Sequence, residues 1–545
     1  MEKDLQDSLI QIIKSSLKGL GLEGTSNEDL YLDLPTDSRF GDLSTNIALR
    51  LSKAIGKPPL QVAANVIEEI KKHLEKSPLK DYIERIKPEG PGFINFYLSD
   101  RYFYEQLRDV IRDKDAFFRV DTGKGRKVLL EFVSANPTGP LSVAHARQAA
   151  VGDVLGNVLD FLGFKVQREF YLNDEGNQIN ILGGSVELRL KELAGEKIEF
   201  PENYYQGDYI YDIAKKIQEA KIKPPVPGEY AADYILDIIK KELDDFGVKF
   251  DSWYSQKKLR ESGKIDKALD DLKEKKFLYE QDGALWFRST DFKDDKDRVV
   301  IKSDKSYTYL APDIAYHEDK FKRGFQWLIN LWGPDHHGYI NRLVASVEAF
   351  GHKPDSISII IVQLATIFRQ GKPVQMSTRR GQYITLREVL DEVGKDASRF
   401  FFLMRRTSAH LDFDLDVAKK QTSENPVYYV QYAHARICSI LRTSNVETGK
   451  DVDLTVLKEK EELILMKKLL QLPSILNICL ATQDPYMLTI YLQELSEDFH
   501  KFYDQHRVLG QDEALTKARL ALIEATRIVI ATSLGLLGIS KPEKM

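Results

Sequence analysis

Hydrophobic residues follow three successive patterns along the chain, and each pattern predicts a different kind of unit. In the first part, helical spacing at about 3–19 and 43–75 is followed by GPGFINFYLS (90–99), which is typical of a strand after a Gly-Pro-Gly turn. A short charged link at 112–127 then leads into a segment of different composition. We therefore predict an N-terminal α+β domain over residues 1–115.

The middle of the chain has the pattern of a parallel β-sheet. The segment KVLLEFVSA (127–135) is a continuous apolar run, as expected of a strand buried on both faces. A helical segment at 142–164 and a second strand at 165–174 complete a βαβ unit. Residues 185–300 have charged amphipathic helical patterns, and we interpret them as an insertion. The sheet is expected to resume with strands at 306–317, 325–333 and 355–367.

From about residue 425 onward the periodicity is helical throughout, which predicts a helical bundle. The chain is thus divided into domains at 1–115, 116–420 and 421–545. No run of 18 or more uncharged apolar residues occurs, so no membrane span is expected. The first twenty residues lack the basic start and the cleavage site of a signal peptide.

Composition and charge narrow the classes of protein. The 545 residues are 43% hydrophobic and 30% charged, which excludes a largely disordered chain. Cys438 and Cys479 are the two cysteines, which fits a reducing compartment and excludes a cysteine-rich metal site. The net charge of −5 argues against a protein coated in nucleic acid but leaves room for local basic patches that grip RNA.

The segment EFVSANPTGPLSVAHARQ (131–148) carries the strongest chemical signal. A Gly/Pro loop leads from the buried strand into a helix, with Ser142 at the expected N-cap and His145 one turn later. Free N–H groups and the positive end of the helix dipole suit a phosphate group there. The spacing alone fits a capped helix with a surface histidine equally well.

This segment resembles the signature of the arginyl-tRNA synthetases, a family of class I aminoacyl-tRNA synthetases. The resemblance spans nearly the whole chain and continues in the following segments: SRFGDLSTNIAL (38–49), GPGFINFYL (90–98), YLNDEGNQI (171–179), YTYLAPDIAYH (307–317), LWGPDHHGYI (331–340), MSTRRG (376–381), NPVYYVQYAHARI (425–437) and FYDQHRVLGQDEALTKARLALIEATRIVI (502–530).

The resemblance implies a fold and an activity. The fold would be a class I Rossmann-type parallel-sheet catalytic domain with an N-terminal α+β domain that binds the tRNA elbow and a C-terminal helical anticodon-binding bundle. The activity would be ATP-dependent formation of arginyl-adenylate and transfer of arginine to the 3′-terminal adenosine of tRNA(Arg), with Mg²⁺ carried by ATP and usually with tRNA needed for activation. A cytoplasmic monomer without a tightly bound metal is expected.

The two class I signatures are both degenerate here. His145 matches the last histidine of the "HIGH" motif, whereas Ser142 and Ala144 replace its first histidine and its glycine. The "KMSKS" motif matches 375–379 within a Gly-bounded loop at 371–382, and Thr378 replaces its lysine. Candidates for the missing cation are Arg379, Arg380, Lys372 and Lys127; we hypothesise Lys127, which points to the same strand face as Glu131. The implied ATP-binding and catalytic residues are Ser142, His145, Lys127, Met376, Ser377, Thr378, Arg379, Asp335 and His336.

Arginine recognition requires acceptors for a planar guanidinium group, such as carboxylates with a hydroxyl. Tyr309 and Asp313 are four residues apart and would share one face if a helix starts there, although Asp313 alone would also fit an N-cap. Adjacent His336 and His337 point to opposite faces of a strand, which argues against zinc. The resemblance implies these arginine-binding residues: Glu131, Ser134, Asn136, Tyr309, Asp313 and His336.

Aromatic and polar residues in the outer domains are candidates for tRNA contacts, because aromatic rings stack on unpaired bases. The same residues at helical spacing also fit a hydrophobic core. The candidates are Phe40, Asn46, Phe96, Tyr428, Tyr432, Tyr503 and Arg507.

Two other functions compete with arginine ligation. The degenerate signatures would fit a tRNA-binding paralogue that has lost activity, although such a protein would have no reason to keep Glu131, Asn136, Tyr309 and Asp313 together. A pocket with two carboxylates would also suit lysine, but the other motifs do not fit a lysine ligase.

Overall fold

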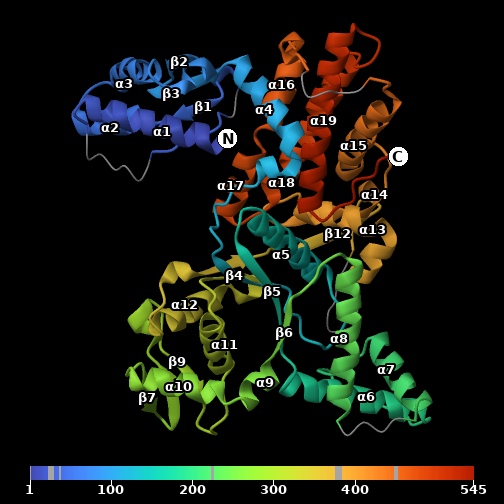
Figure 1. Ribbon diagram of the computed structural model, residues 1–545. Helices are drawn as coiled ribbons and strands as arrows, with labels where there is room; N and C mark the ends of the chain where they lie inside the picture. The colour runs from blue at the N-terminus through green and yellow to red at the C-terminus, as the bar shows by residue number, and fades with distance from the viewer. Residues whose placement is uncertain (1, 23–29, 36–37, 222–225, 375–382, 447–451) are drawn as a thin grey trace.

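The computed structural model describes residues 2–22, 30–35, 38–221, 226–374, 383–446 and 452–545. The N-terminal unit has a three-stranded antiparallel sheet in the order β1-β3-β2 with helices packed against it (Figure 1). Phe96 of β3 is fully buried, and its backbone lies opposite Leu43 and Ile86. The elements are α1 (Glu2–Gly19), β1 (Leu43–Thr45), α2 (Ile47–Ile55), α3 (Pro59–Leu74), β2 (Ile83–Glu89) and β3 (Phe93–Leu98).

Helix α4 (Asp100–Asp113) connects this unit to the rest of the chain and packs against the C-terminal helices α16 and α19 (Figure 1). The hydroxyl of Tyr104 donates a hydrogen bond to the carbonyl of Leu457 over 2.8 Å. Asp42 of the N-terminal unit forms an ion pair of 2.8 Å with Lys467 of α16. These contacts hold the N-terminal unit against the bundle.

The central domain is built on a five-stranded parallel sheet in the order β11-β10-β4-β5-β6. The chain passes from β4 through α5 (Val143–Phe161) to β5 and β6, and then returns to the other side of β4 for β10. Ligands bind in such sheets beyond the carboxyl ends of the strands where the order reverses, which here lies between β4 and β10. The strands are β4 (Lys127–Glu131), β5 (Lys165–Leu172), β6 (Ser252–Ser255), β10 (Trp327–Trp332) and β11 (Ile357–Ile361).

The expected helical insertion at 185–300 is corrected by the structure, because strand β6 of the main sheet lies inside it. Four residues are too few to give a recognisable periodic pattern. Before β6 come α6 (Asn177–Leu193), α7 (Asp208–Glu219) and α8 (Pro227–Asp245). After it come α9 (Gln256–Glu261), α10 (Lys264–Glu274) and an antiparallel sheet of β7 (Leu278–Gln281), β8 (Ala284–Phe287) and β9 (Arg298–Ile301).

Three predicted strands also need correction. The segment at 306–317 forms the start of helix α11 (Leu310–Lys322), because Leu310 and Ile314 share a buried helical face. The segment at 355–367 contains parts of two strands in different sheets, β11 and β12 (Ala365–Arg369). Strand β4 ends before 135, since Val133 and Ser134 have φ values of 68° and 41°, which no strand residue adopts.

The remaining elements connect the main sheet to the C-terminal part, which is helical as predicted. Helix α12 (Ile340–Ala349) joins β10 to β11, and β12 pairs with β13 (Lys372–Pro373) and β14 (Leu411–Asp414). Helix α13 (Leu386–Leu403) and α14 (Leu415–Ala418) lead to the bundle (Figure 1). The bundle helices are α15 (Pro426–Thr443), α16 (Lys460–Leu469), α17 (Leu472–Thr482), α18 (Tyr486–Gln505) and α19 (Glu513–Leu536).

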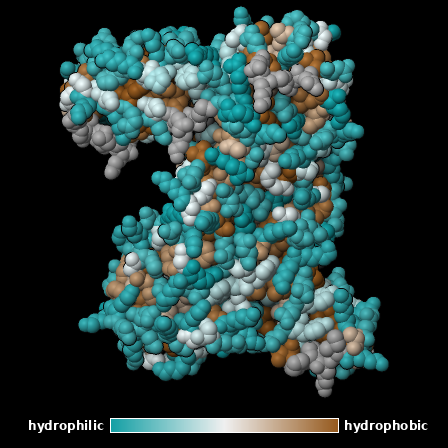
Figure 2. Space-filling view, in the orientation of Figure 1, coloured by the Kyte–Doolittle hydropathy of each residue, from teal (hydrophilic) through white to brown (hydrophobic). Residues whose placement is uncertain are grey.

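Hydrophilic side chains predominate on the visible surface, and the outline is hollowed between the N-terminal unit and the central domain (Figure 2). Among the described helices, none is by itself long and apolar enough to cross a membrane. The bent pair α16–α17 passes that test only when its two helices are counted together.

Candidate active site

The carboxyl ends of β4 and β10 bring four segments together at the point where the strand order reverses. Strand β4 ends at Glu131, β10 ends at Trp332, α5 starts at Val143 and α11 starts at Leu310. The segment 334–339, which holds Asp335, His336 and Tyr339, forms a short 3-10 helix directly after β10. Residues from distant parts of the sequence therefore meet at one edge of the sheet.

His145 is held at the N-terminus of α5 in one tautomer. The backbone N–H of Ser142 donates to its Nδ1 over 3.2 Å, so Nδ1 must be an acceptor and Nε2 carries the proton. The Ser142 hydroxyl lies 3.2 Å from the same nitrogen. Burial lowers the pKa of His145 to about 4, against the opposing effect of the Asp335 carboxylate. His145 is thus a neutral N–H donor at physiological pH.

The loop that precedes α5 is fixed by the segment that leads into α13. The backbone N–H of Leu386 donates to Leu141 over 2.7 Å, and that of Val143 donates to Ile384 over 3.2 Å. The Tyr383 hydroxyl donates to the carbonyl of Pro140 over 3.0 Å. The N-terminus of α5 is therefore positioned by α13 as well as by β4.

Residues of the second signature fall outside the described part of the chain, namely Met376, Ser377, Thr378, Arg379 and Arg380. Lys372 is exposed in β13. The position of Lys127 contradicts the hypothesis that it replaces the missing signature lysine. It is the exposed first residue of β4, so it lies at the amino end of the strand, four residues and roughly 13 Å from Glu131 at the carboxyl end. Sharing a strand face with Glu131 does not bring it to the site.

Glu131 is already bound to a cation that sequence analysis did not find. Its carboxylate accepts hydrogen bonds from the Lys320 ammonium group over 2.5 Å and from the Ser134 hydroxyl over 3.1 Å. The Lys320 side chain is fully buried and also donates to Asn330 over 3.1 Å. The Ser134 hydroxyl oxygen accepts the backbone N–H of Tyr171 over 3.1 Å. Lys320 therefore balances the charge of the Glu131 carboxylate, and these hydrogen bonds fix its position.

Around this ion pair, polar residues of α11 and of the sheet form a buried hydrogen-bond network. His317 Nδ1 donates to the carbonyl of Asp313 over 2.8 Å, which leaves Nε2 to accept from Asn330 over 2.7 Å. Burial lowers the pKa of His317 well below its ordinary value, so it is neutral. Glu169 of β5 accepts a bidentate pair of hydrogen bonds from Arg323, at 2.6 and 2.8 Å, and one from Tyr316 at 2.8 Å. These groups fix α11 against the sheet.

Asp313 lies in the first turn of α11 and has no cation on its side chain among the described residues. The Tyr339 hydroxyl donates to its carboxylate over 2.7 Å. Burial raises the pKa of Asp313 to about 7, and the nearby Glu131 carboxylate also raises it. The hydrogen bond from Tyr339 and the charge of Lys320 lower the pKa, but by less. Such a carboxyl group is ready to ionise when a cation enters. Tyr309 lies one turn earlier at the start of the helix and is 73% exposed, so of these two α11 residues the structure brings Asp313 rather than Tyr309 towards Glu131.

The other predicted site residues line the same edge with fewer contacts. Asp335 and His336 are exposed, and the His336 ring lies 5.8 Å from the ring of Trp332. Asn136 is half-buried in the loop between β4 and α5. Within the described part of the chain, no group of three or more His, Cys, Asp or Glu side chains is arranged to hold a metal ion.

The candidates for tRNA contact differ in their exposure. Phe40 is 44% exposed, and the Asn46 side chain donates to the Tyr31 hydroxyl over 3.0 Å. Phe96 is fully buried in the sheet core, so the prediction that it contacts tRNA is corrected. All residues of β3 from Ile94 to Leu98 are buried, so the central position of the strand leaves Phe96 no access to solvent.

The bundle presents an aromatic surface formed by α15 and α18. Tyr428 and Tyr432 stack with ring centroids 6.3 Å apart, and His500 stacks on Tyr432 at 5.8 Å. These rings line an open cavity of 450 Å³. Arg436 lies over the ring of Tyr503, 4.8 Å from its centroid, and Arg507 is exposed. We call the Tyr428, Tyr432, His500 and Tyr503 rings the aromatic face.

Comparison with known proteins shows the same relatives along the whole chain. Three family models match: the "Arginyl tRNA synthetase N terminal domain" at residues 7–98, "tRNA synthetases class I (R), catalytic domain" at 106–437 and the "DALR anticodon binding domain" at 430–545. The arginine–tRNA ligase of Citrifermentans bemidjiense is 46% identical, over 99% of this chain and 100% of its own. That of Bacillus subtilis (strain 168) is 43% identical, over 100% of this chain and 99% of its own.

Solved structures agree with this relationship. A putative arginyl-tRNA synthetase from Campylobacter jejuni superposes with a TM-score of 0.77 at 36% identity, covering 82% of this chain and 100% of its own. The arginyl-tRNA synthetase of Thermus thermophilus superposes with a TM-score of 0.79 over 99% of this chain and 100% of its own. At 21% identity, this second likeness shows the fold alone.

Proposed function

The chain belongs to the arginyl-tRNA synthetase family and is an arginine–tRNA ligase, and on this premise we propose which residues carry its reaction. One observation supports the assignment above the others. A buried carboxyl group with a raised pKa, Asp313, lies at the same sheet edge as a neutral histidine at a helix N-terminus, His145. The first suits a guanidinium group, and the second suits a phosphate.

The guanidinium group of arginine binds Asp313, with Tyr339 holding the carboxylate in place. A planar cation with several N–H donors satisfies both oxygens of one carboxylate, whereas the compact ammonium group of lysine cannot do so at the same distance. Glu131 is neutralised by Lys320, so the pocket offers the side chain one free negative charge. The arrangement supports selection of arginine by geometry, with Glu131, Ser134 and Asn136 towards the amino-acid backbone end.

The α-phosphate of ATP binds at the N-terminus of α5. His145 donates from Nε2, and the Ser142 N-cap and helix dipole add positive potential without a charged side chain. The arginine carboxylate attacks the α-phosphorus, the bond to pyrophosphate breaks, and arginyl-adenylate remains. Donors fixed before the reaction stabilise the charge that develops on the phosphate oxygens. Mg²⁺ enters with ATP, and Asp335 and His336 lie beside this pocket.

Transfer then requires the 3′-terminal adenosine of tRNA(Arg) in the same pocket. The aromatic face is suited to unpaired anticodon bases, because bases stack on exposed aromatic rings and a nearby arginine adds to this attraction. The N-terminal unit, with Phe40 and Asn46, would contact the tRNA elbow across the hollow seen in Figure 2. As an enzyme of translation the protein would act in the cytoplasm, as a monomer whose activation step depends on tRNA.

Pyrophosphate exchange with L-arginine tests this proposal, run with and without tRNA(Arg). Lysine and ornithine serve as controls for the side chain. Exchange with arginine alone among the three amino acids, and only when tRNA is present, would support the assignment. Equal exchange with lysine would refute the role of Asp313, and exchange without tRNA would refute tRNA dependence while leaving the ligase assignment intact.

A further inference from the structure

Helix α13 consists of two helical segments that meet at Gly394. Gly394 has φ 78° and ψ 170°, a conformation that is essentially restricted to glycine. The first segment starts at Leu386, after the N-cap residue Thr385, and contacts the loop before α5 through the Leu386–Leu141 hydrogen bond. The second segment is held in the body of the protein by Arg399, which bonds Asp153 of α5 and the carbonyl of Leu537. The break therefore separates a segment that contacts the loop before α5 from a segment anchored both to the body of α5 and to the end of the bundle.

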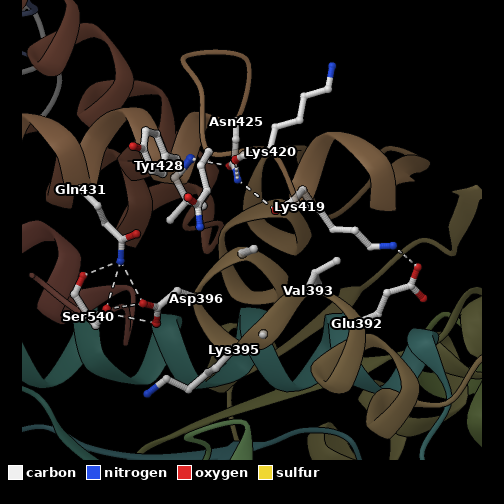
Figure 3. Close-up of a pocket in the computed structure, with 15 residues that line it drawn as sticks. Glu392, Val393, Lys395, Asp396, Lys419, Lys420, Asn425, Tyr428, Gln431 and Ser540 are labelled. Carbon is white, nitrogen blue, oxygen red and sulfur yellow. Dashed lines mark hydrogen bonds and ion pairs between the residues drawn. The ribbon is translucent and has the colours of Figure 1, made fainter. Parts of the chain in front are cut away.

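A polar cluster directly after the break connects α13 to the bundle. The Gln431 amide of α15 donates to Asp396 Oδ2 over 2.9 Å and to the carbonyl and hydroxyl oxygens of Ser540, at 2.9 and 3.0 Å (Figure 3). The Ser540 hydroxyl donates to the same carboxylate, and its N–H donates to Asp396 Oδ1 over 3.1 Å. His434, one turn after Gln431, donates from Nδ1 to the carbonyl of Pro542 over 2.9 Å. The C-terminal segment is thus clamped between α15 and α13.

The same surface of α15 leads directly to the aromatic face. Tyr428 lies one turn before Gln431 and lines two cavities: the cavity of the aromatic face and an open cavity of 630 Å³ bounded by Gly394, Asp396 and Ser540 (Figure 3). A base stacked on Tyr428 would therefore be one helical turn from the Asp396 cluster. The open cavity leaves room for the two segments of α13 to change their angle.

We propose that Asp396 is a positioning residue that couples occupancy of the aromatic face to the N-terminus of α5. Binding of tRNA to α15 displaces Gln431 and Ser540 from Asp396 and so frees the turn that follows Gly394. Arg399 keeps the rest of the second segment in place, and the segment before Gly394 swings about the hinge and moves the Leu386–Leu141 contact. Glycine hinges of this kind absorb large backbone changes over one residue. The inference rests on the proposed binding of tRNA at the aromatic face, and it supplies the physical route for tRNA-dependent activation.

The test compares Asp396→Ala, Asp396→Asn and Asp391→Ala in the full-length protein, by tRNA-dependent pyrophosphate exchange and tRNA binding. Asp391 lies in the same helix before the break and pairs only with Arg387 among the described residues, so it controls for loss of a helical carboxylate. We expect Asp396→Ala to lower kcat by about tenfold or more, a typical coupling between sites, with arginine KM and tRNA Kd nearly unchanged. Asp396→Asn keeps one acceptor and should retain part of the rate, and Asp391→Ala should match the wild type.

Backbone variants keep the proposal testable if Asp396→Ala does not fold. Gly394→Ala meets no atom within 4 Å of its added Cβ and changes only the backbone preference; Gly195→Ala, with φ 91° and equally free space, is its control. We expect the first to lower tRNA-dependent kcat and the second to leave it unchanged. Unchanged kcat in Gly394→Ala or Asp396→Ala, or a fall that only follows weaker tRNA binding, would overturn the coupling. A wild type that exchanges equally without tRNA would also overturn it, and a wild type that never exchanges arginine would instead refute the proposed function.

Discussion

Arginine should bind more weakly at pH 6 than at pH 8, because Asp313 must ionise before it can receive a guanidinium group. In the empty pocket, burial raises the pKa of this carboxyl to about 7. A bound cation stabilises the charged form and lowers that pKa, so binding releases a proton whenever Asp313 starts out protonated. Below pH 7 this proton release opposes binding; above pH 7 the carboxylate is already charged and the affinity no longer changes.

The magnitude follows from the same value. The difference between an ordinary carboxyl pKa of 3.8 and about 7 corresponds to roughly 4 kcal/mol for ionising Asp313 in the empty pocket, less whatever water in the open site contributes. With a pKa of 7, about a tenth of the carboxyl is ionised at pH 6 and about nine tenths at pH 8. The apparent Kd for arginine should therefore fall by about tenfold between these values. His145 and His317 stay neutral in this range and add no slope.

Calorimetry in two buffers of different ionisation enthalpy measures both the affinity and the number of protons released. We expect nearly one proton released per arginine at pH 6 and almost none at pH 8. Asp313→Asn should abolish the proton release and weaken binding at pH 8 by roughly tenfold to a hundredfold, since it removes a charged hydrogen-bond partner. An Asp313→Asn protein that still releases a proton at pH 6 would show that another group titrates and would refute the reasoning.

Three further predictions follow from other parts of the molecule. His145→Asn should lower the kcat of pyrophosphate exchange by roughly a hundredfold to a thousandfold with a small change in arginine KM, because a donor to the transition state is lost; an unchanged kcat contradicts its role. Tyr432→Ala should raise the tRNA KM by roughly fivefold to a hundredfold, as expected for one lost stacking partner, whereas Tyr211→Ala, at similar exposure on α7, should not; equal effects would exclude the aromatic face. Burial raises the pKa of Glu242 to about 7, so the folded protein holds a proton that the unfolded chain loses, and stability falls as pH rises from about 4.5 to 7. Glu242→Gln should therefore raise the free energy of unfolding at pH 8 by roughly 3 kcal/mol, seen as a higher thermal unfolding midpoint, and leave it nearly unchanged at pH 4; equal shifts at both pH values would contradict this.

Periodicity predicts the long elements of this chain well and the short ones poorly. The buried strand at 127–131, helix α5 and the helical C-terminal part all have patterns long enough to identify. Strand β6 has four residues, and its neighbours in sequence are amphipathic helices, so nothing in its pattern marks it as a sheet member. The tyrosines and the isoleucine at the start of helix α11 favour a strand locally, whereas packing against α10 favours a helix.

The candidate site could be predicted in its residues but not in its charge balance. The segment 131–148 located His145, since a helix start after a buried strand is visible in sequence, and Glu131 followed from the family resemblance of the same segment. Lys320 could not be found in this way, because a lysine in a charged helical segment normally faces solvent. Its partnership with Glu131 arises only when α11 packs on the sheet, 189 residues away along the chain. Lys127 shows the reverse case, where a correct strand face still leaves the side chain at the wrong end.

The structure of the protein with L-arginine bound would show directly whether Asp313 receives the guanidinium group. We predict the guanidinium group within hydrogen-bond distance of the Asp313 carboxylate, with Lys320 still bound to Glu131. A guanidinium group that displaces Lys320 from Glu131, or that lies away from Asp313, would refute the proposed arginine pocket.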